Sequence, residues 1–453
     1  MPWAGPMPSV TSVPPATRAV APFRSPVAPA PLDDSGTCVP VSATLAINDA
    51  IAARRRRGQP VLPLGFGEAG VPVHPFLAAE LAAAAGRGGY GPVAGSAELR
   101  TAAAGYWSRR GLPTRAEYVV AGPGSKALLF GLLLAIGSDV AVPQPSWVSY
   151  AAQAQLAGLQ ARFVPAPAGM GGICDPDALA AAVQESRAAG RTLRAVVVTL
   201  PDNPTGTLAT PRAVRELCAV AHRHDLIIIS DEIYRDLVHD PGTDFLSPAQ
   251  MAPERTVVTT ALSKSLALGG WRLGVARLPA GPLGAALRDR LLGVASEIWS
   301  APAAPIQHAA AVAFSEPPEI RDRIARSRAL HATVARAVAR VCREAGLAVP
   351  APQASFYVYP DFGPWRGWLR SRNVRTGADL ARHLITEYGM GTLPASAFGE
   401  AEDVLRLRLA TGMLYGDTTA QREEALAAAD PLRLPPIASA LCRLAEILAD
   451  LGP

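Results

Sequence analysis

A lysine in a turn of small residues is the side chain best placed for covalent chemistry. Lys264 lies in the segment Thr260-Ala-Leu-Ser-Lys-Ser-Leu-Ala-Leu-Gly-Gly-Trp-Arg272, directly after a strand-like run. A Schiff base requires an amine that can lose its proton, which lysine can do and arginine cannot. Arg272 can offer a planar guanidinium group to a phosphate. Taken alone, the segment is more typical of a partly buried lysine held in a salt bridge.

Two further polar residues follow apolar, strand-like runs. Asp231 opens Asp-Glu-Ile-Tyr234 after Ile227-Ile-Ile-Ser, and Asn203 opens Asn-Pro-Thr-Gly after the run that ends at Leu200. Open α/β sheets bind ligands at the carboxyl ends of their strands. A carboxylate there can hold a pyridine nitrogen protonated, and an amide can donate to a phenolate oxygen. The alternatives are a helix cap for Asp231 and a simple turn at Asn-Pro.

A glycine-containing turn predicts a site for an anion. The segment Gly122-Pro-Gly124-Ser125-Lys126 follows a strand-like run and opens an apolar helix. Free backbone amides at such a helix start can hold a phosphate, although the spacing is not that of a GxxxxGK[ST] loop. Trp147 stands just past another strand-like run, where its ring can stack on a planar cofactor or simply pack in the core.

A second glycine pattern points to a different class of site. Gly65-Phe-Gly-Glu-Ala-Gly70 matches GxGxxG, the pattern of dinucleotide-binding turns. Pro72 and Pro75 follow it, so the helix that such a site requires cannot begin cleanly. We therefore expect no dinucleotide here.

These residues need a scaffold in which short strands alternate with helices. The sequence contains apolar strand-like runs at residues 118–121, 140–142, 195–200, 226–230 and 256–260. Continuous apolar strands between helices predict an α/β fold with a largely parallel sheet covered on both faces. After about residue 315 a long Arg/Ala-rich helix at 318–346 and strand-like runs at 356–359 and 405–409 predict a smaller α+β lobe.

The chain has 453 residues, of which 49% are hydrophobic, and this is enough for two lobes. We predict five segments: a disordered Pro/Ala-rich extension at 1–38, an N-terminal helix segment that joins the small domain at 39–62, a large domain at 63–314, a small domain at 315–430 and a C-terminal helix at 431–453. No stretch resembles a membrane span, so no membrane is expected.

Charge and cysteine usage exclude several partners. The net charge is +5, and Arg54–Arg57 could form a patch for nucleic acid. We favour a helix end, because the run closes an apolar-periodic segment just before Gly58. The five cysteines form no CxxC pair, which predicts reduced thiols in a cytoplasm. His222 and His224 lack a third ligand, so no metal is expected.

Several motifs occur in the order seen in class I/II aminotransferases, over about residues 39–426. The motifs are Tyr90-Gly-Pro-Val-Ala-Gly95 with Leu99-Arg100, the Gly124-Ser-Lys126 turn, Trp147, Asn203-Pro-Thr-Gly206, Asp231-Glu-Ile-Tyr234, Ser263-Lys264 and Arg272. The chain thus resembles the aspartate-aminotransferase-like enzymes of fold type I. The resemblance implies a homodimer that binds pyridoxal 5'-phosphate in a large domain, beside a smaller α+β domain.

The resemblance also implies roles for individual residues. Lys264 would carry the cofactor and move protons, and Asp231 would pair with the ring nitrogen. Tyr234 and Asn203 would bond the phenolate oxygen of the ring, and Trp147 would stack on it. Asn203 and Trp147 would also face the substrate.

The same resemblance implies how the cofactor phosphate and the substrate are held. Backbone amides of Ser125 and Lys126, together with Ser263 and Arg272, would hold the cofactor, and Tyr90 would reach the phosphate from the neighbouring subunit.

Gly67 resembles a backbone contact to the substrate. Arg406 resembles the arginine that clamps the substrate carboxylate. Arg408 competes with it, because strand alternation puts both on one face. Alignment on Ala410-Thr411 favours Arg406.

Departures from the family pattern bear on the reaction. Ala69 and Ala261 stand where the family commonly has Pro and a phosphate-binding Ser, and the lost hydroxyl would weaken cofactor binding by about 1 kcal/mol. Arg408 replaces a small residue. These features disfavour a plain aspartate enzyme and suggest specialised metabolism.

We expect transfer of an amino group between an amino acid and a 2-oxo acid. The alternative on the same scaffold is an elimination, replacement or cyclising enzyme. A transcription regulator would need a DNA-binding domain, and the roughly 35 N-terminal residues contain too many prolines to supply one.

Overall fold

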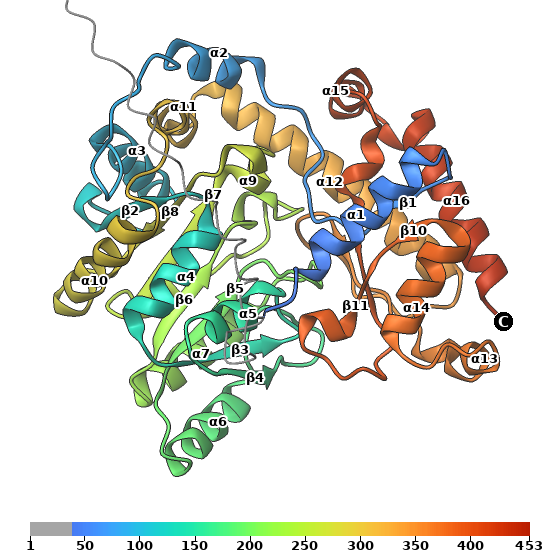
Figure 1. The fold of residues 1–453 in the computed structure, drawn as a ribbon, viewed down its shortest axis with the longest axis horizontal. Helices are drawn as coiled ribbons and strands as arrows, with labels where there is room; N and C mark the ends of the chain where they lie inside the picture. Colours follow the sequence, from blue (N-terminus) through green and yellow to red (C-terminus); the bar gives the residue numbers. More distant parts are fainter. Residues whose placement is uncertain (1–38) are drawn as a thin grey trace, which may run out of the picture. The chain divides into compact units, whose positions relative to one another are not determined.

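A computed structural model describes residues 39–453, which form one compact unit (Figure 1). The extension predicted at 1–38 lies outside the described residues. No contact-based division separates the predicted large and small domains within 39–453. The boundaries at 62, 314 and 430 therefore stay predictions.

A seven-stranded sheet forms the centre of the fold, in the order β2-β8-β7-β6-β5-β3-β4. Its strands are β2 (Val119–Gly122), β3 (Asp139–Gln144), β4 (Ala161–Pro165), β5 (Leu193–Thr199), β6 (Ile227–Asp231), β7 (Thr256–Ala261) and β8 (Gly274–Arg277). Neighbours pair in parallel except at β8, which is antiparallel to both β2 and β7. The prediction of a largely parallel sheet is confirmed, whereas β8 was not predicted.

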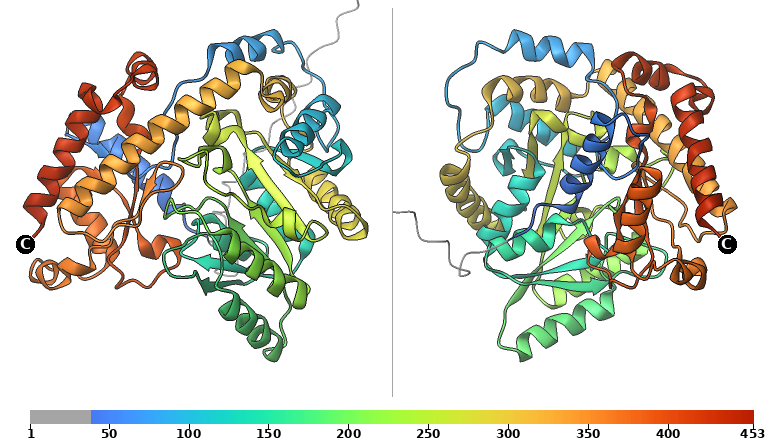
Figure 2. Two further views of the ribbon diagram at one scale, coloured as in Figure 1. Left: turned by 180° about the vertical axis from the view of Figure 1, so that it is seen from behind. Right: turned by 45° about the vertical axis from the view of Figure 1, so that its right-hand side comes forward.

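Helices cover both faces of this sheet (Figures 1 and 2). Along β5, Val196 and Val198 belong to one buried cluster while Ala195 and Val197 belong to another, as the two-residue period of a strand requires. The first cluster is closed by α6 (Pro176–Ala188) and α7 (Pro211–Arg223), and the second by α4 (Ser125–Ile136), α5 (Ser149–Leu156) and α10 (Pro282–Ile298). Burial on both faces explains why the strands read as continuous apolar runs.

Short elements complete this half of the fold. Beside β2 and β8, helices α2 (Pro75–Ala83), α3 (Ala97–Ser108) and α11 (Ala304–Ser315) pack on one another, and the single-turn helices are α8 (Pro248–Met251) and α9 (Leu262–Ser265). Helix α9 follows β7 without a break, so whatever it carries is held at the carboxyl end of the sheet.

The C-terminal part is an assembly of helices around small sheets. Antiparallel strands run in the order β11 (Leu393–Pro394), β12 (Leu407–Ala410) and β9 (Tyr357–Val358), and β1 (Leu62–Pro63) pairs in parallel with β10 (Met390–Gly391). The helices are α12 (Pro318–Glu344), α13 (Arg366–Ser371), α14 (Gly377–His383), α15 (Thr419–Ala427) and α16 (Pro435–Leu451). The predicted mixture of helix and short strands after residue 315 is confirmed.

Both ends of the described chain pack on this assembly (Figure 2). Helix α1 (Ala43–Arg56) contacts β10 and ends in Arg54–Arg56, and Gly58 follows with a positive φ of 67°. The interpretation of the arginine run as a helix end is confirmed. Helix α16 buries Ile437, Leu444 and Ile447 in the core around α12, which confirms the predicted C-terminal helix.

Within residues 39–453 no helix is long and apolar enough to cross a membrane.

Candidate active site

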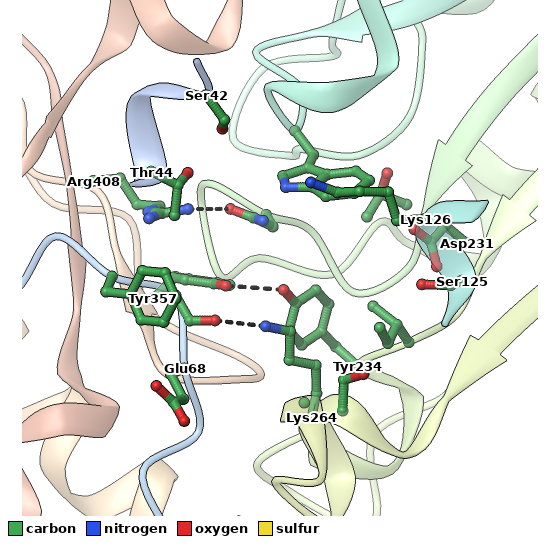
Figure 3. Close-up of a pocket in the computed structure, with 18 of the residues that line it drawn as sticks. Ser42, Thr44, Glu68, Ser125, Lys126, Asp231, Tyr234, Lys264, Tyr357 and Arg408 are labelled. Carbon is green, nitrogen blue, oxygen red and sulfur yellow. Dashed lines mark hydrogen bonds between the residues drawn. The ribbon is translucent and has the colours of Figure 1, made fainter. Parts of the chain in front are cut away.

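A cavity of about 490 Å³ opens at the carboxyl ends of β5, β6 and β7 (Figure 3). It is lined by every site residue predicted from the sequence except Tyr90 and Arg406: Gly67, Ser125, Lys126, Trp147, Asn203, Asp231, Tyr234, Ser263, Lys264 and Arg272. These residues are spread over some 200 positions of the chain, about the length of a whole domain. The parallel sheet brings them together because each of its strands ends at the same edge.

Asp231 is the last residue of β6 and is 3% exposed. Its carboxylate accepts hydrogen bonds from the Tyr150 hydroxyl at 3.0 Å and from the Thr259 hydroxyl at 3.2 Å. Burial raises the pKa of Asp231 to about 6, against the lowering by these two hydrogen bonds. A buried carboxylate that faces a cavity without a basic side chain bonded to it is suited to a cationic ligand group.

Lys264 lies on α9 with its ammonium group turned into the cavity, where Nζ donates to the carbonyl oxygen of Gly67 at 2.5 Å (Figure 3). Burial lowers the pKa of Lys264 to about 8, and the charge of Arg408 lowers it further, while Glu68 acts in the opposite direction. An amine with this pKa supplies far more neutral nucleophile near pH 7 than an exposed lysine does.

Tyr234 and Asn203 line the same cavity as Lys264 and can donate hydrogen bonds. The hydroxyl of Tyr234 lies 2.9 Å from the hydroxyl of Tyr357, and both rings are buried. The Oδ1 atom of Asn203 accepts a hydrogen bond from Arg408 Nη1 at 3.2 Å. This bond fixes the orientation of the Asn203 amide and leaves its NH2 group to donate elsewhere.

The opposite end of the cavity carries positive charge, and a glycine there lets a ligand approach the backbone closely. Gly124 has a φ of 85°, and a Cβ added there would lie 2.5 Å from Nη2 of Arg272. Ser125 begins helix α4, so its amide is one of the free donors at a helix N-terminus. Lys126 lies beside Trp147, with Nζ 5.2 Å from the ring centroid, and its pKa is lowered by burial and by the charge of Arg272. Such a cradle suits a phosphate.

The structure places Arg408 in the cavity, and not Arg406, which the alignment favoured. Arg408 is 1% exposed, and its Nη2 donates to the carbonyl oxygen of Gly65 at 2.7 Å. Arg406 instead lines a separate cavity, where it pairs with Asp361 at 3.0 Å and Glu400 at 2.6 Å. Arg408 lies on β12, whereas Arg406 precedes that strand and makes only an isolated bridge with Asp361, so tertiary packing decides which arginine meets the site.

The remaining predicted residue, Tyr90, does not line the cavity and is 100% exposed in the single chain. Sequence reasoning missed Tyr150 and Tyr357, whose hydroxyl groups bond Asp231 and Tyr234. Tyr150 lies six residues after the end of β3, inside helix α5, so no local signal marked it. Glu68, next to the predicted Gly67, also lines the cavity.

Residues 39–453 contain no group of three or more side chains that could hold a metal ion. Four cysteines in this part are free thiols, and only Cys442 among them is exposed.

Comparison with known proteins connects this geometry to a family. Residues 61–427 match the family described as aminotransferase class I and II. The chain is 33% identical to the aspartate/prephenate aminotransferase of Cereibacter sphaeroides, over 81% of this chain and 92% of that protein. It is 31% identical to the aspartate aminotransferase of Geobacillus stearothermophilus, over 84% and 95%.

Solved structures agree with the sequence relatives. The aspartate aminotransferase from Thermus thermophilus with maleate superposes with a TM-score of 0.75 at 27% identity, covering 90% of this chain and 97% of that chain. An aminotransferase from Mycobacterium tuberculosis has the same fold, with a TM-score of 0.75. The chain therefore belongs to the class I and II aminotransferases, a family generally dependent on pyridoxal phosphate, and it is an enzyme of fold type I that transfers amino groups.

Proposed function

We propose that this aminotransferase binds pyridoxal 5'-phosphate in the cavity through Lys264 and transfers an amino group between an amino acid and a 2-oxo acid. The observation that carries the proposal is the pairing of a lysine whose pKa is lowered to about 8 with a buried aspartate in one cavity. The first is suited to react with an aldehyde, and the second to hold a ring nitrogen protonated.

The residues present fit each chemical feature of this cofactor. Its phosphate matches the cradle of Arg272 and the Ser125 amide, where the absent Cβ of Gly124 leaves room. Its pyridine nitrogen matches Asp231, whose carboxylate is buried and is held by neutral hydroxyl groups. Its planar ring matches the indole of Trp147, which lines the same cavity.

The bound cofactor supplies an electron sink for the bonds of the substrate α-carbon. The residues of the chain do the rest. Nζ of Lys264 accepts the α-proton and returns it, and a pKa near 8 suits both directions. Asp231 keeps the ring nitrogen protonated, and Tyr234 and Asn203 donate to the ring oxygen. Arg408 holds the substrate carboxylate with its planar fork, beside Asn203.

The names of the relatives guide the choice of first substrate. The two sequence relatives above are described as aspartate/prephenate and aspartate aminotransferases. We propose an acidic amino acid as the first donor to test, because both relatives are described as acting on aspartate. The departures at Ala69 and Ala261 oppose it, and a role in specialised metabolism stays a prediction.

We propose in addition that the enzyme is a homodimer and lies in the cytoplasm. The family resemblance implies that Tyr90 reaches the site of a second copy in a homodimer, and its full exposure in the single chain is compatible with this. The free thiols of the described cysteines support a reducing cytoplasm. Size-exclusion chromatography with light scattering tests the dimer, and a stable monomer would contradict it.

The function is tested by the absorbance spectrum of the purified protein, followed by titration with single amino acids. We expect a visible band that is absent in Lys264→Ala. An amino donor should convert it to a near-ultraviolet band, and a 2-oxo acid should restore it. No band after addition of pyridoxal phosphate would contradict the cofactor. A long-lived band at longer wavelength that no 2-oxo acid reverses would show elimination, replacement or cyclisation instead.

A further inference from the structure

Tyr357 contacts several functional groups of the site although no motif drew attention to it. It lies on β9, is 1% exposed, and turns its hydroxyl into the cavity (Figure 3). That hydroxyl lies 2.9 Å from the hydroxyl of Tyr234. A Cβ added at Gly67 would lie 2.6 Å from the same oxygen, so the glycine makes the room that the phenol occupies. The carbonyl of Gly67 is in turn the acceptor for Lys264.

The ring of Tyr357 has a separate neighbour. The guanidinium carbon of Arg408 lies 4.9 Å from the centroid of this ring and 5.2 Å from that of Phe398. Arginine stacks favourably on aromatic faces, and the interaction grows as water is excluded. Two aromatic rings and the acceptors at Gly65 and Asn203 thus fix the position of Arg408.

The hydrogen bond between the Tyr234 and Tyr357 hydroxyls constrains which of the two donates its proton. A phenol has a single proton to donate. When the Tyr234 proton is directed at a ligand oxygen in the cavity, Tyr234 can take part in the 2.9 Å bond only as acceptor, so Tyr357 must donate to it. A donor that itself receives a hydrogen bond is polarised and donates more strongly. Arg408 likewise orients Asn203 by occupying its Oδ1.

We propose that Tyr357 is a positioning residue with two separable actions: its hydroxyl directs the Tyr234 proton toward the ring oxygen of the cofactor, and its ring seats Arg408 for the substrate carboxylate. This inference rests on the proposed function, because the ring oxygen is that of pyridoxal phosphate. The two actions belong to different atoms of one side chain, and two substitutions separate them.

Tyr357→Phe keeps the ring and removes the hydroxyl. Donors to the ring oxygen favour its anionic form, so the pKa read from the pH titration of the visible band should rise by about half a unit to one unit, as expected for one weakened hydrogen bond. The affinity for maleate, measured by its spectral change, should stay within about twofold. Tyr357→Leu removes the ring as well, and maleate should then bind about fivefold to tenfold more weakly.

Tyr359→Phe is the matched control. It makes the same chemical change two residues along, where the hydroxyl bonds Glu400 at the separate cavity, so neither measurement should move. A Tyr357→Phe band that titrates as in the unsubstituted enzyme would overturn the hydroxyl action, and unchanged maleate binding in Tyr357→Leu would overturn the ring action. Absence of the band from the unsubstituted enzyme would instead overturn the proposed function.

Discussion

Replacement of Arg408 by Gln tests the assignment of the carboxylate-binding residue. The guanidinium is 1% exposed and is held by Gly65 and Asn203 at 2.7 and 3.2 Å, so a substrate carboxylate would meet it out of water. Loss of one partner of a buried, hydrogen-bonded charge pair costs about 2 to 5 kcal/mol. At 1.4 kcal/mol per factor of ten, kcat/KM should fall by about 30-fold to 4,000-fold.

Arg406→Gln supplies the comparison two residues earlier in the chain. Its side chain is 41% exposed and already pairs with Asp361 and Glu400, and partly exposed ion pairs contribute about 0 to 1 kcal/mol. We expect kcat/KM to change by less than about fivefold. Arg408→Lys should fall between the two, because a lysine keeps the charge but loses the planar fork.

The assay is steady-state transamination across a range of amino donor concentrations, with maleate affinity as a second measurement. The cofactor band and the melting temperature are checked first, so that a folding defect is not mistaken for lost binding. A larger loss in Arg406→Gln than in Arg408→Gln would refute the assignment and restore the residue favoured from the sequence alone.

Three further predictions concern the cofactor. The pKa of Lys264 is lowered to about 8, so the neutral fraction of its amine falls about tenfold per pH unit below that value. Capture of pyridoxal phosphate by cofactor-free protein should therefore rise with pH and level off above pH 8. A rise that continues to pH 10 would contradict the lowered pKa. Asp231→Asn should keep the cofactor band but lower kcat by about 100-fold or more, and near-normal turnover would show that no carboxylate is needed at the ring nitrogen. Gly124→Ala should weaken equilibrium binding of pyridoxal phosphate by about tenfold, because the new methyl group would lie 2.5 Å from Arg272. Gly190→Ala is the control: its φ of 70° is similarly positive, but no atom lies within 4 Å of the added Cβ, so cofactor binding should not change.

How much of the site could be predicted from the sequence depends on how far apart along the chain the interacting residues lie. Asp231, Asn203 and Lys264 were found from the sequence because each directly follows a buried apolar strand or its turn. In a parallel sheet such positions lie at one edge, because the parallel strands all end there. Strand β8 was missed: it runs antiparallel to its neighbours in an otherwise parallel sheet, and it follows the turn that carries Lys264 and Arg272 without an intervening helix of more than one turn.

The residues that orient the site were not predictable in this way. Tyr150 reaches Asp231 from helix α5, and Tyr357 reaches Tyr234 from β9, more than 120 positions away along the chain. Neither contact follows from local spacing, because each depends on how one element packs against another. Tyr90 is a different case, since its predicted partner would be a second chain.

The sequence by itself determined the alternation of strands and helices, the turn residues at the sheet edge and the lysine that faces the cavity, because these depend on neighbours within a few positions. The tertiary structure alone decided between Arg406 and Arg408. Both have the same side chain, and strand alternation in the sequence predicts one face for both, so local chemistry does not distinguish them. Packing makes the difference: Asp361 and Glu400 neutralise Arg406 at one cavity, while Arg408 lies two residues further on, between aromatic rings at the other.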